Sequence, residues 1–236
     1  MGYNQQRLFL YTIADILQSV KQKFYVLLGD VIHSRRITDR DDFQRGIEKT
    51  CQIVNTLYSG DTYADFKILK GIDEIGGVLT SMSKTYEIIT TILEEIYPNL
   101  MRFVLAFDYI DTAVATRDIT KMDGPAFHKA SDMIYKLKGS KLVCDISTND
   151  KMIDTIIAGQ INSILLMKIN WSVRQHQVVK EYERTMNQSK VAENFGMTQQ
   201  AVSKILNRSM WREINQIEEN LSFVLHKYQQ MQESRK

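Results

Sequence analysis

One face of a predicted helix near the C-terminal end of the chain carries side chains that suit contacts with the edges of DNA bases. At helical spacing this face consists of Gln199, Gln200, Ser203, Lys204 and Asn207. A glutamine side chain bonds an adenine edge in two places, a serine suits any base or a phosphate, and a lysine suits guanine or a phosphate. Double-stranded DNA is therefore the first partner to consider.

The residues around this face have the spacing of a helix-turn-helix over residues 188–207. Ala192 is small where two helices must touch, and Gly196 follows four residues later, where the chain must turn. Thr198 is a suitable N-cap for the second helix, because its hydroxyl accepts from an unpaired backbone N–H. Apolar contacts are expected from Val191, Phe195, Met197, Val202, Ile205 and Leu206. The alternative is a helical hairpin that packs on its neighbour and leaves its polar face in solvent.

Basic residues extend the expected DNA-binding surface beyond the second helix. Arg208 and Arg212 are expected to continue past that helix and suit backbone phosphates, while Lys190 lies on the preceding helix, which normally crosses the backbone. The 236-residue chain has a net charge of only +2, so its affinity must come from a local patch. The basic residues that outnumber the acids in this region are Lys168, Arg174, Lys180, Arg184, Lys190, Lys204, Arg208 and Arg212.

Three carboxylates in the N-terminal half form a candidate metal site. Asp30 follows the apolar run Phe24–Leu28, and Asp73 and Glu74 lie at the tip of a predicted hairpin. If the first strand lies beside that hairpin strand, these carboxylates converge, and Mg²⁺ prefers such oxygen ligands when it holds a triphosphate. The alternative is that all three are solvated turn residues that cap backbone groups.

The chain divides into a mixed half and a helical half. The first half has the predicted order strand, helix, strand, strand, helix, strand, followed by a further helix and strand, so residues 1–148 are expected to form a ferredoxin-like domain with an N-terminal helix at residues 6–20. Residues 149–236 are expected to form an all-α domain that contains the helix-turn-helix. The predicted fold class is therefore α+β. The other predicted helices cover residues 41–58, 83–96, 126–137, 152–168, 171–184 and 210–232.

Three motifs followed by the helix-turn-helix resemble the SatD family of bacterial and archaeal proteins. The motifs are GDVIHSRR, DEIGGVL and DGPAFHKA, and the resemblance covers roughly residues 24–225. The positions that match the family motifs are Gly29, Asp30, Ser34, Arg35, Asp73, Glu74, Gly124, Pro125, Ala126, Phe127 and His128. The resemblance implies a DNA-binding protein and makes Ser34, Arg35 and His128 candidate ligand contacts. For His128, the alternative is a side chain that bonds only its neighbours.

A more distant resemblance links the first domain to the palm of class III nucleotidyl cyclases and GGDEF-type diguanylate cyclases. In those enzymes two metal-binding aspartates occupy positions similar to Asp30 and Asp73. The chain departs from them because His128 and Asp132 stand where the cyclases place an asparagine and an arginine. An acid is unsuited to a position where developing phosphate charge needs a cation. The palm is therefore interpreted as a nucleotide or metal sensor, or a degenerate scaffold, ahead of an enzyme.

These observations favour a DNA-binding protein, expected to be a transcriptional regulator, whose palm-like domain senses a ligand or pairs subunits. A lone helix-turn-helix buries little surface, so a homodimer is expected, with residues 152–168 and 210–232 as its interface. The first alternative is a Mg²⁺-dependent nucleotidyl cyclase, transferase or phosphohydrolase that acts on an NTP through Asp30 and Asp73. The second is an interaction protein in which the closing helix covers the polar face.

The cysteines and the apolar runs indicate a cytoplasmic location. Cys51 and Cys144 are the chain's two cysteines, and their separation gives neither a zinc spacing nor a disulfide framework. No apolar run is expected to be long enough to span a membrane, and the first twenty residues lack the pattern of a signal peptide.

Overall fold

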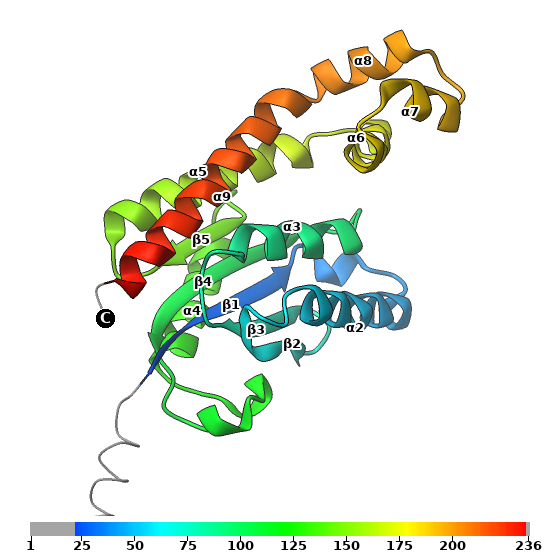
Figure 1. Cartoon of the computed structure of the whole chain (residues 1–236). Helices are drawn as coiled ribbons and strands as arrows, with labels where there is room; N and C mark the ends of the chain where they lie inside the picture. The colour runs from blue at the N-terminus through cyan, green and yellow to red at the C-terminus, as the bar shows by residue number, and fades with distance from the viewer. Residues whose placement is uncertain (1–21, 235–236) are drawn as a thin grey trace, which may run out of the picture.

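The computed structural model describes residues 22–234 and contains a five-stranded sheet with helices on both faces (Figure 1). The strands are β1 (Lys23–Val31), β2 (Thr62–Lys70), β3 (Glu74–Leu79), β4 (Met101–Tyr109) and β5 (Cys144–Ser147). Their order across the sheet is β2-β3-β1-β4-β5, with β4 and β5 parallel and the other neighbours antiparallel. The predicted α+β class is confirmed. The helix expected at residues 6–20 lies outside the described residues.

The central strand β1 is buried on both faces of the sheet. Its alternate side chains enter two separate cores: Tyr25 and Leu27 belong to one, and Phe24, Val26 and Leu28 belong to the other. A strand covered on both faces has no solvent side that would require polar residues at alternate positions. This burial explains why β1 is an unbroken apolar run in the sequence.

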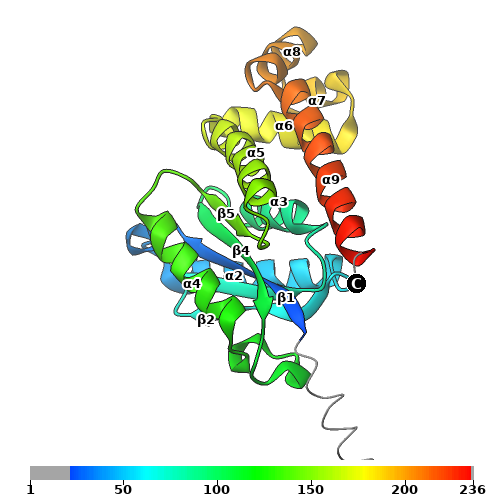
Figure 2. The same cartoon turned by 90° about the vertical axis from the view of Figure 1, so that its left-hand side faces the viewer.

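Helices cover the two faces of the sheet unequally. One face packs against α4 (Pro125–Lys138), and the other packs against α2 (Arg40–Leu57) and α3 (Thr85–Glu95). Figure 2 shows α4 on one side of the sheet and α3 and α5 (Lys151–Ile169) on the other. The more heavily covered face therefore also receives the first helix of the predicted helical half.

The helix α5 is bonded directly to the edge strand β5. Asn162 is buried, accepts from the backbone N–H groups of Val143 at 2.8 Å and Cys144 at 3.0 Å, and donates to the carbonyl of Cys144 at 2.7 Å. The last helix, α9 (Trp211–Glu233), buries Leu221 and Leu225 in the same core. The expected boundary at residue 149 therefore marks where the strands end, but not where the hydrophobic core ends.

The helices α6 (Val173–Thr185), α7 (Gln188–Asn194) and α8 (Gln199–Arg208) form a lobe with a small core of its own. Figure 1 shows this α6–α8 lobe projecting beyond the sheet, at the ends of α5 and α9. Its core consists of Val178, Val179, Val191, Ala192, Val202 and Leu206. Because this core is separate, the lobe can keep its internal geometry while its attachment to the sheet changes.

Two chain crossings, at residues 169–172 and 208–211, connect the α6–α8 lobe to the rest of the chain, and we call them the neck. The Nε1 of Trp171 donates to the carbonyl oxygen of Ser209 at 3.1 Å, which bonds one crossing to the other. The Nε1 of Trp211 donates to the carboxylate of Glu183 at 3.1 Å. Both tryptophans of the chain therefore lie in the neck.

By length and composition alone, α5 is apolar enough to cross a membrane, which corrects the expectation that no segment would be. Within the structure, however, Ile157, Ile161 and Ile164 of this helix are fully buried against the sheet. Apolar side chains on the inner face of a core helix explain the same composition.

Candidate nucleic-acid interface

The α7–α8 pair is joined by a tight turn whose geometry the sequence predicts well. Gly196 has φ +60°, a left-handed conformation that favours glycine. The N–H of Met197 donates to the carbonyl of Ala192 at 2.9 Å and closes the turn. The hydroxyl of Thr198 accepts from the N–H of Ala201 at 3.1 Å, so the predicted N-cap of the second helix is confirmed.

The helix α8 has one buried face and one open face. Val202 and Leu206 are buried in the small core of the lobe. The predicted base-contacting side chains lie on the opposite side: Gln199, Gln200, Lys204 and Asn207 are exposed, and Ser203 is half-buried. Among residues 22–234, no side chain or backbone group forms a hydrogen bond or ion pair with these five side chains. The closing helix α9 therefore leaves this face open.

Half of the predicted basic patch is already engaged within the chain. Lys168 pairs with Glu218 at 2.5 Å, Arg184 pairs with Glu181 at 2.6 Å, and Lys180 lies 3.9 Å from Glu94. Arg174 stacks over the ring of Phe195 and donates to its carbonyl oxygen at 3.3 Å. These four cations mainly hold the lobe together or attach it, because their charge is balanced or their donors are used.

The other half of the basic patch is free to meet phosphates. Lys190 on α7, Lys204 and Arg208 on α8, and Arg212 on α9 are exposed. Within the described part of the chain, none of their side chains forms an ion pair or hydrogen bond. From the sequence, Arg208 was expected to follow the second helix, but it is the last residue of α8. The four cations come from three helices, and Lys204 is itself part of the open polar face of α8.

At the predicted carboxylate site, unlike at the open face of α8, the charged side chains are paired with one another. Asp30 on β1 lies directly opposite Glu74 on β3 and Arg102 on β4, and Glu74 lies opposite Lys70 on β2. The carboxylate of Asp30, whose side chain is only 7% exposed, lies 2.7 Å from the Nζ of Lys138 on α4 and 3.7 Å from Arg102. We call these five residues the Asp30 row. Its two acids are balanced by three cations.

Burial shifts the pKa of the second acid in the Asp30 row. The pKa of Glu74 is raised above its ordinary value, chiefly because burial penalises the charged carboxylate and also because Asp30 lies nearby. Lys70 and Lys138 oppose this shift. The raised pKa of Glu74 therefore reflects its burial more than the charges around it.

The residues present do not fit the expected Mg²⁺ site. Asp73 lies in the hairpin turn, where its carbonyl accepts from the N–H of Val31 at 2.8 Å. Its buried Oδ1 has no partner within the described chain, so this one oxygen stays available to a cation. Asp30 is already neutralised by Lys138 and Arg102. Over residues 22–234, no group of three or more histidine, cysteine, aspartate or glutamate side chains is arranged to hold a metal ion.

The three candidate ligand contacts lie at opposite ends of the sheet. Ser34 and Arg35 are in a short 3-10 helix that follows β1, close to Asp30 in the chain. His128 is 71% exposed and lies 3.1 Å from the carboxylate of Asp123. Lys138, which pairs with Asp30, follows His128 by ten residues on α4, so roughly 15 Å of helix separates His128 from that end of the sheet. His128 therefore makes the local bond that was its alternative interpretation.

A model of the SatD family matches residues 24–215 of the sequence. The chain belongs to the SatD family. No curated protein matches its sequence. The resemblance given by the three motifs is therefore confirmed at the level of the family.

Two solved structures of a bacterial light-regulated adenylyl cyclase align with this SatD protein at 11% and 12% sequence identity, both with a TM-score of 0.38. Each alignment covers 63% of this chain. The chain spans about half the length of those cyclase structures, with 55% and 54% of them covered. A likeness this weak carries no argument about activity.

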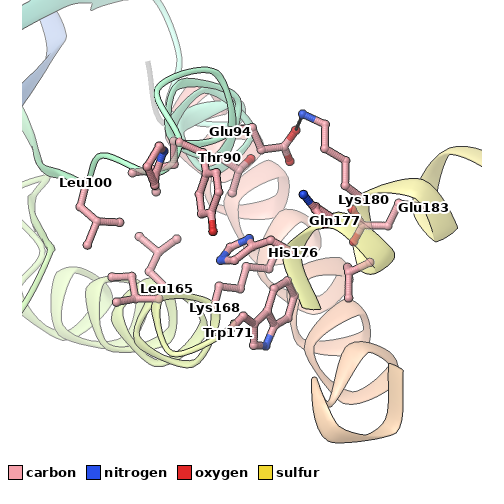
Figure 3. A pocket seen from close by; sticks show the side chains of 15 residues that line it. Thr90, Glu94, Leu100, Leu165, Lys168, Trp171, His176, Gln177, Lys180 and Glu183 are labelled. Atoms are coloured by element: carbon pink, nitrogen blue, oxygen red, sulfur yellow. Dashed lines mark ion pairs between the residues drawn. The ribbon is translucent and has the colours of Figure 1, made fainter. Parts of the chain in front are cut away.

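The SatD chain also contains a cavity that the sequence did not reveal. It has a volume of about 300 Å³ and lies between α3, the end of α5 and α6 (Figure 3). Its walls come from residues 90–100, 165–171 and 176–183, three segments that sequence spacing alone does not place together. The sequence feature that could have pointed to this cavity is an aromatic residue near the end of two of these segments: Tyr97 before Pro98 and Trp171 before Ser172.

Proposed function

We propose that this SatD protein is a cytoplasmic DNA-binding protein that regulates transcription. In this proposal the α7–α8 pair is a helix-turn-helix, and α8 reads base edges in the major groove. The observation that carries the proposal is the open polar face of α8, which is held on a capped helix and has no partner among the described residues. Side chains left free on a rigid element are available to a partner.

The distribution of free cations supports the same orientation of α8. Lys190 on α7 is suited to the backbone on one side of the groove, and Arg208 and Arg212 are suited to phosphates at the other end of α8. A Lys or Arg that neutralises a phosphate releases counterions, so these contacts supply affinity that depends on salt. Base selectivity in this arrangement comes from Gln199, Gln200 and the residues one turn later.

We infer that the sheet domain is ferredoxin-like and palm-like but serves as a scaffold, as a nucleotide sensor or in subunit pairing. The order β4-β1-β3-β2 is the strand order of a ferredoxin-like sheet, with β5 added at one edge. A catalytic function is not favoured, because the carboxylate of Asp30 is held by Lys138 and Arg102.

The proposed DNA-binding form is a homodimer. One helix-turn-helix reads one half-site, and a two-fold dimer places two recognition helices about one DNA turn apart. The inner faces of α5 and α9 are used within the chain, but Met152 and Ile156 on α5 and Phe223 on α9 remain 67%, 51% and 62% exposed. Apolar side chains of this size on the outer faces of the two helices support an interface there.

Binding to fragments of the native genome tests the proposed function. The double change Gln200→Ala plus Lys204→Ala is expected to weaken specific binding by roughly 10- to 100-fold and to reduce the salt slope by about 1. The matched control is Gln52→Ala plus Lys49→Ala, which alters the same residue types on the exposed face of α2. Equal affinity and an equal salt slope in wild type and the α8 variant would contradict the proposal.

A further inference from the structure

The cavity between the sheet domain and the α6–α8 lobe has mostly apolar walls. Figure 3 shows Leu165 and Lys168 at the end of α5 on one side, Thr90 and Glu94 of α3 on another, and His176 of α6 in the middle. A volume of about 300 Å³ is at the lower end of the range for small-molecule sites in proteins. The space is therefore suited to a small compound.

Three aromatic side chains meet in this cavity. The ring of His176 lies between those of Tyr97, at a centroid distance of 4.5 Å, and Trp171, at 5.2 Å. Burial lowers the pKa of His176, which favours the neutral form of its ring. The faces of neutral aromatic rings attract flat rings and cations, but not anions.

The charged groups around the cavity leave an excess of acid. Glu94 of α3 and Glu183 of α6 both line it, and Lys180 lies 3.9 Å from Glu94, with both of those side chains more than half exposed. The inner cation, Lys168, is already paired with Glu218. Although Glu183 keeps contact with solvent, its pKa is raised, chiefly by partial burial; Lys168 and the hydrogen bond from Trp211 oppose this shift, and Glu218 and Glu94 add to it. A positive charge placed between the carboxylates would relieve their repulsion.

We propose that this cavity binds a small planar organic cation, such as a protonated aromatic amine. The flat ring stacks against Tyr97, His176 and Trp171, and the ammonium group lies between Glu94 and Glu183. Neither the aromatic faces nor the excess carboxylate suits an organic anion, and a neutral ring would gain no charge interaction with the two acids.

Because the cavity lies between the sheet and the α6–α8 lobe, a bound ligand is expected to change the affinity for DNA as well. This second part of the inference rests on the proposed DNA-binding function. The contacts that span it are the ring contact between Tyr97 and His176 and the long ion pair between Lys180 and Glu94. A ligand that touches both α3 and α6 adds a bridge and fixes the α6–α8 lobe against the sheet. A fixed lobe orientation sets the separation of the two α8 helices in a dimer, and hence the affinity for DNA.

Isothermal titration calorimetry with three probes that share one ring system tests the site on the full chain. 2-Naphthylmethylammonium is expected to bind with a Kd of roughly 0.1 to 1 mM. The neutral alcohol 2-naphthalenemethanol is expected to bind about fivefold more weakly, and the anion 2-naphthylacetate is expected not to bind, because only the cation interacts favourably with the carboxylates. An ammonium probe that binds no more tightly than the alcohol, or not at all, overturns the proposal.

An isosteric change of the two acids tests the assignment to this cavity. Glu94→Gln plus Glu183→Gln is expected to weaken the ammonium probe about tenfold, to the level of the alcohol, and to leave alcohol binding unchanged. The control is Glu95→Gln, an exposed neighbour on α3 that does not line the cavity. Equal weakening by the control, or no weakening by the double variant, assigns the binding to another surface.

A DNA titration with and without the ammonium probe separates the two parts of the inference. Wild type is expected to change its DNA affinity at least threefold when the probe is bound, and the Glu94→Gln plus Glu183→Gln variant is expected not to change. Probe binding with unaltered DNA affinity overturns the coupling. Absence of DNA binding by the wild type overturns the proposed function, whereas the ligand site is decided by the calorimetry alone.

Discussion

The Asp30 row in the sheet and the open face of α8 both carry polar and charged side chains, but they use them in opposite ways. In the row, Asp30 is 7% exposed in its side chain and faces two cations within hydrogen-bonding or ion-pair distance. On α8, Gln200 and Lys204 are exposed and have no partner among residues 22–234. The first set is satisfied inside the chain, and the second set is available to something outside it.

The difference follows from where each set lies in the fold. Asp30 lies near the end of a central strand that is covered on both faces, and a charge there is costly unless it is paired. The helix α8 packs only its inner face, so its outer residues contribute little to folding. The residue types at these outer positions can therefore be selected for binding a partner, because folding does not dictate them.

The largest expected effect is on the stability of the sheet. Asp30→Ala removes the acid that balances Arg102 and Lys138 and is expected to lower the free energy of unfolding by about 2 to 3 kcal/mol. Urea unfolding measures it, and DNA affinity should not change. A loss below about 0.5 kcal/mol, together with Mg²⁺-dependent NTP turnover that this change abolishes, would restore the enzymatic interpretation of Asp30.

A pair of arginines in the same lobe tests whether a free cation differs from a paired one. Arg208→Ala is expected to weaken DNA binding about five- to tenfold and to lower the salt slope by about 1, because its guanidinium has no partner within the described chain. Arg184→Ala is expected to have a smaller effect, because Glu181 already balances its charge at 2.6 Å. Filter-binding or anisotropy titrations at several salt concentrations compare them. Equal losses would remove the distinction between free and paired cations.

The cap of α8 tests how firmly the open face is held. Thr198→Ala removes the oxygen that accepts from Ala201 and is expected to cost about 1 kcal/mol in local stability of α8. Hydrogen exchange of the α8 amides measures this loss. Thr198→Ser keeps the acceptor and serves as the control. If both variants exchange like wild type, α8 does not depend on its cap.

The smallest expected effect concerns the second acid of the Asp30 row. Because the pKa of Glu74 is raised on folding, the folded chain holds its proton more tightly, and the ionised carboxylate opposes folding at pH values above the folded pKa. Glu74→Gln is therefore expected to raise the free energy of unfolding at pH 7 by on the order of 0.5 kcal/mol, a value reduced by solvent screening. The gain should disappear below the ordinary pKa of 4.5. A gain that grows as the pH falls would contradict this assignment.

Sequence patterns predicted local structure well because the relevant information is local. The apolar run of β1, the turn at Gly196 and the cap at Thr198 each depend on residues within a few positions of one another. The partners of Asp30 were missed because Arg102 and Lys138 come from a distant strand and helix, and no spacing rule connects them. The shared core of α5 and α9 with the sheet was missed for the same reason.

Both tryptophans of the chain lie in the neck and are half-buried. The indole nitrogen of Trp171 bonds one crossing to the other, and that of Trp211 bonds the neck to α6. Indole emission shifts in wavelength when its surroundings change, and the sheet core contributes no competing signal of this kind. The unlabelled protein therefore carries an intrinsic fluorescent reporter of lobe attachment. Trp171 also lines the cavity, so a flat ligand that stacks there should quench part of this emission directly.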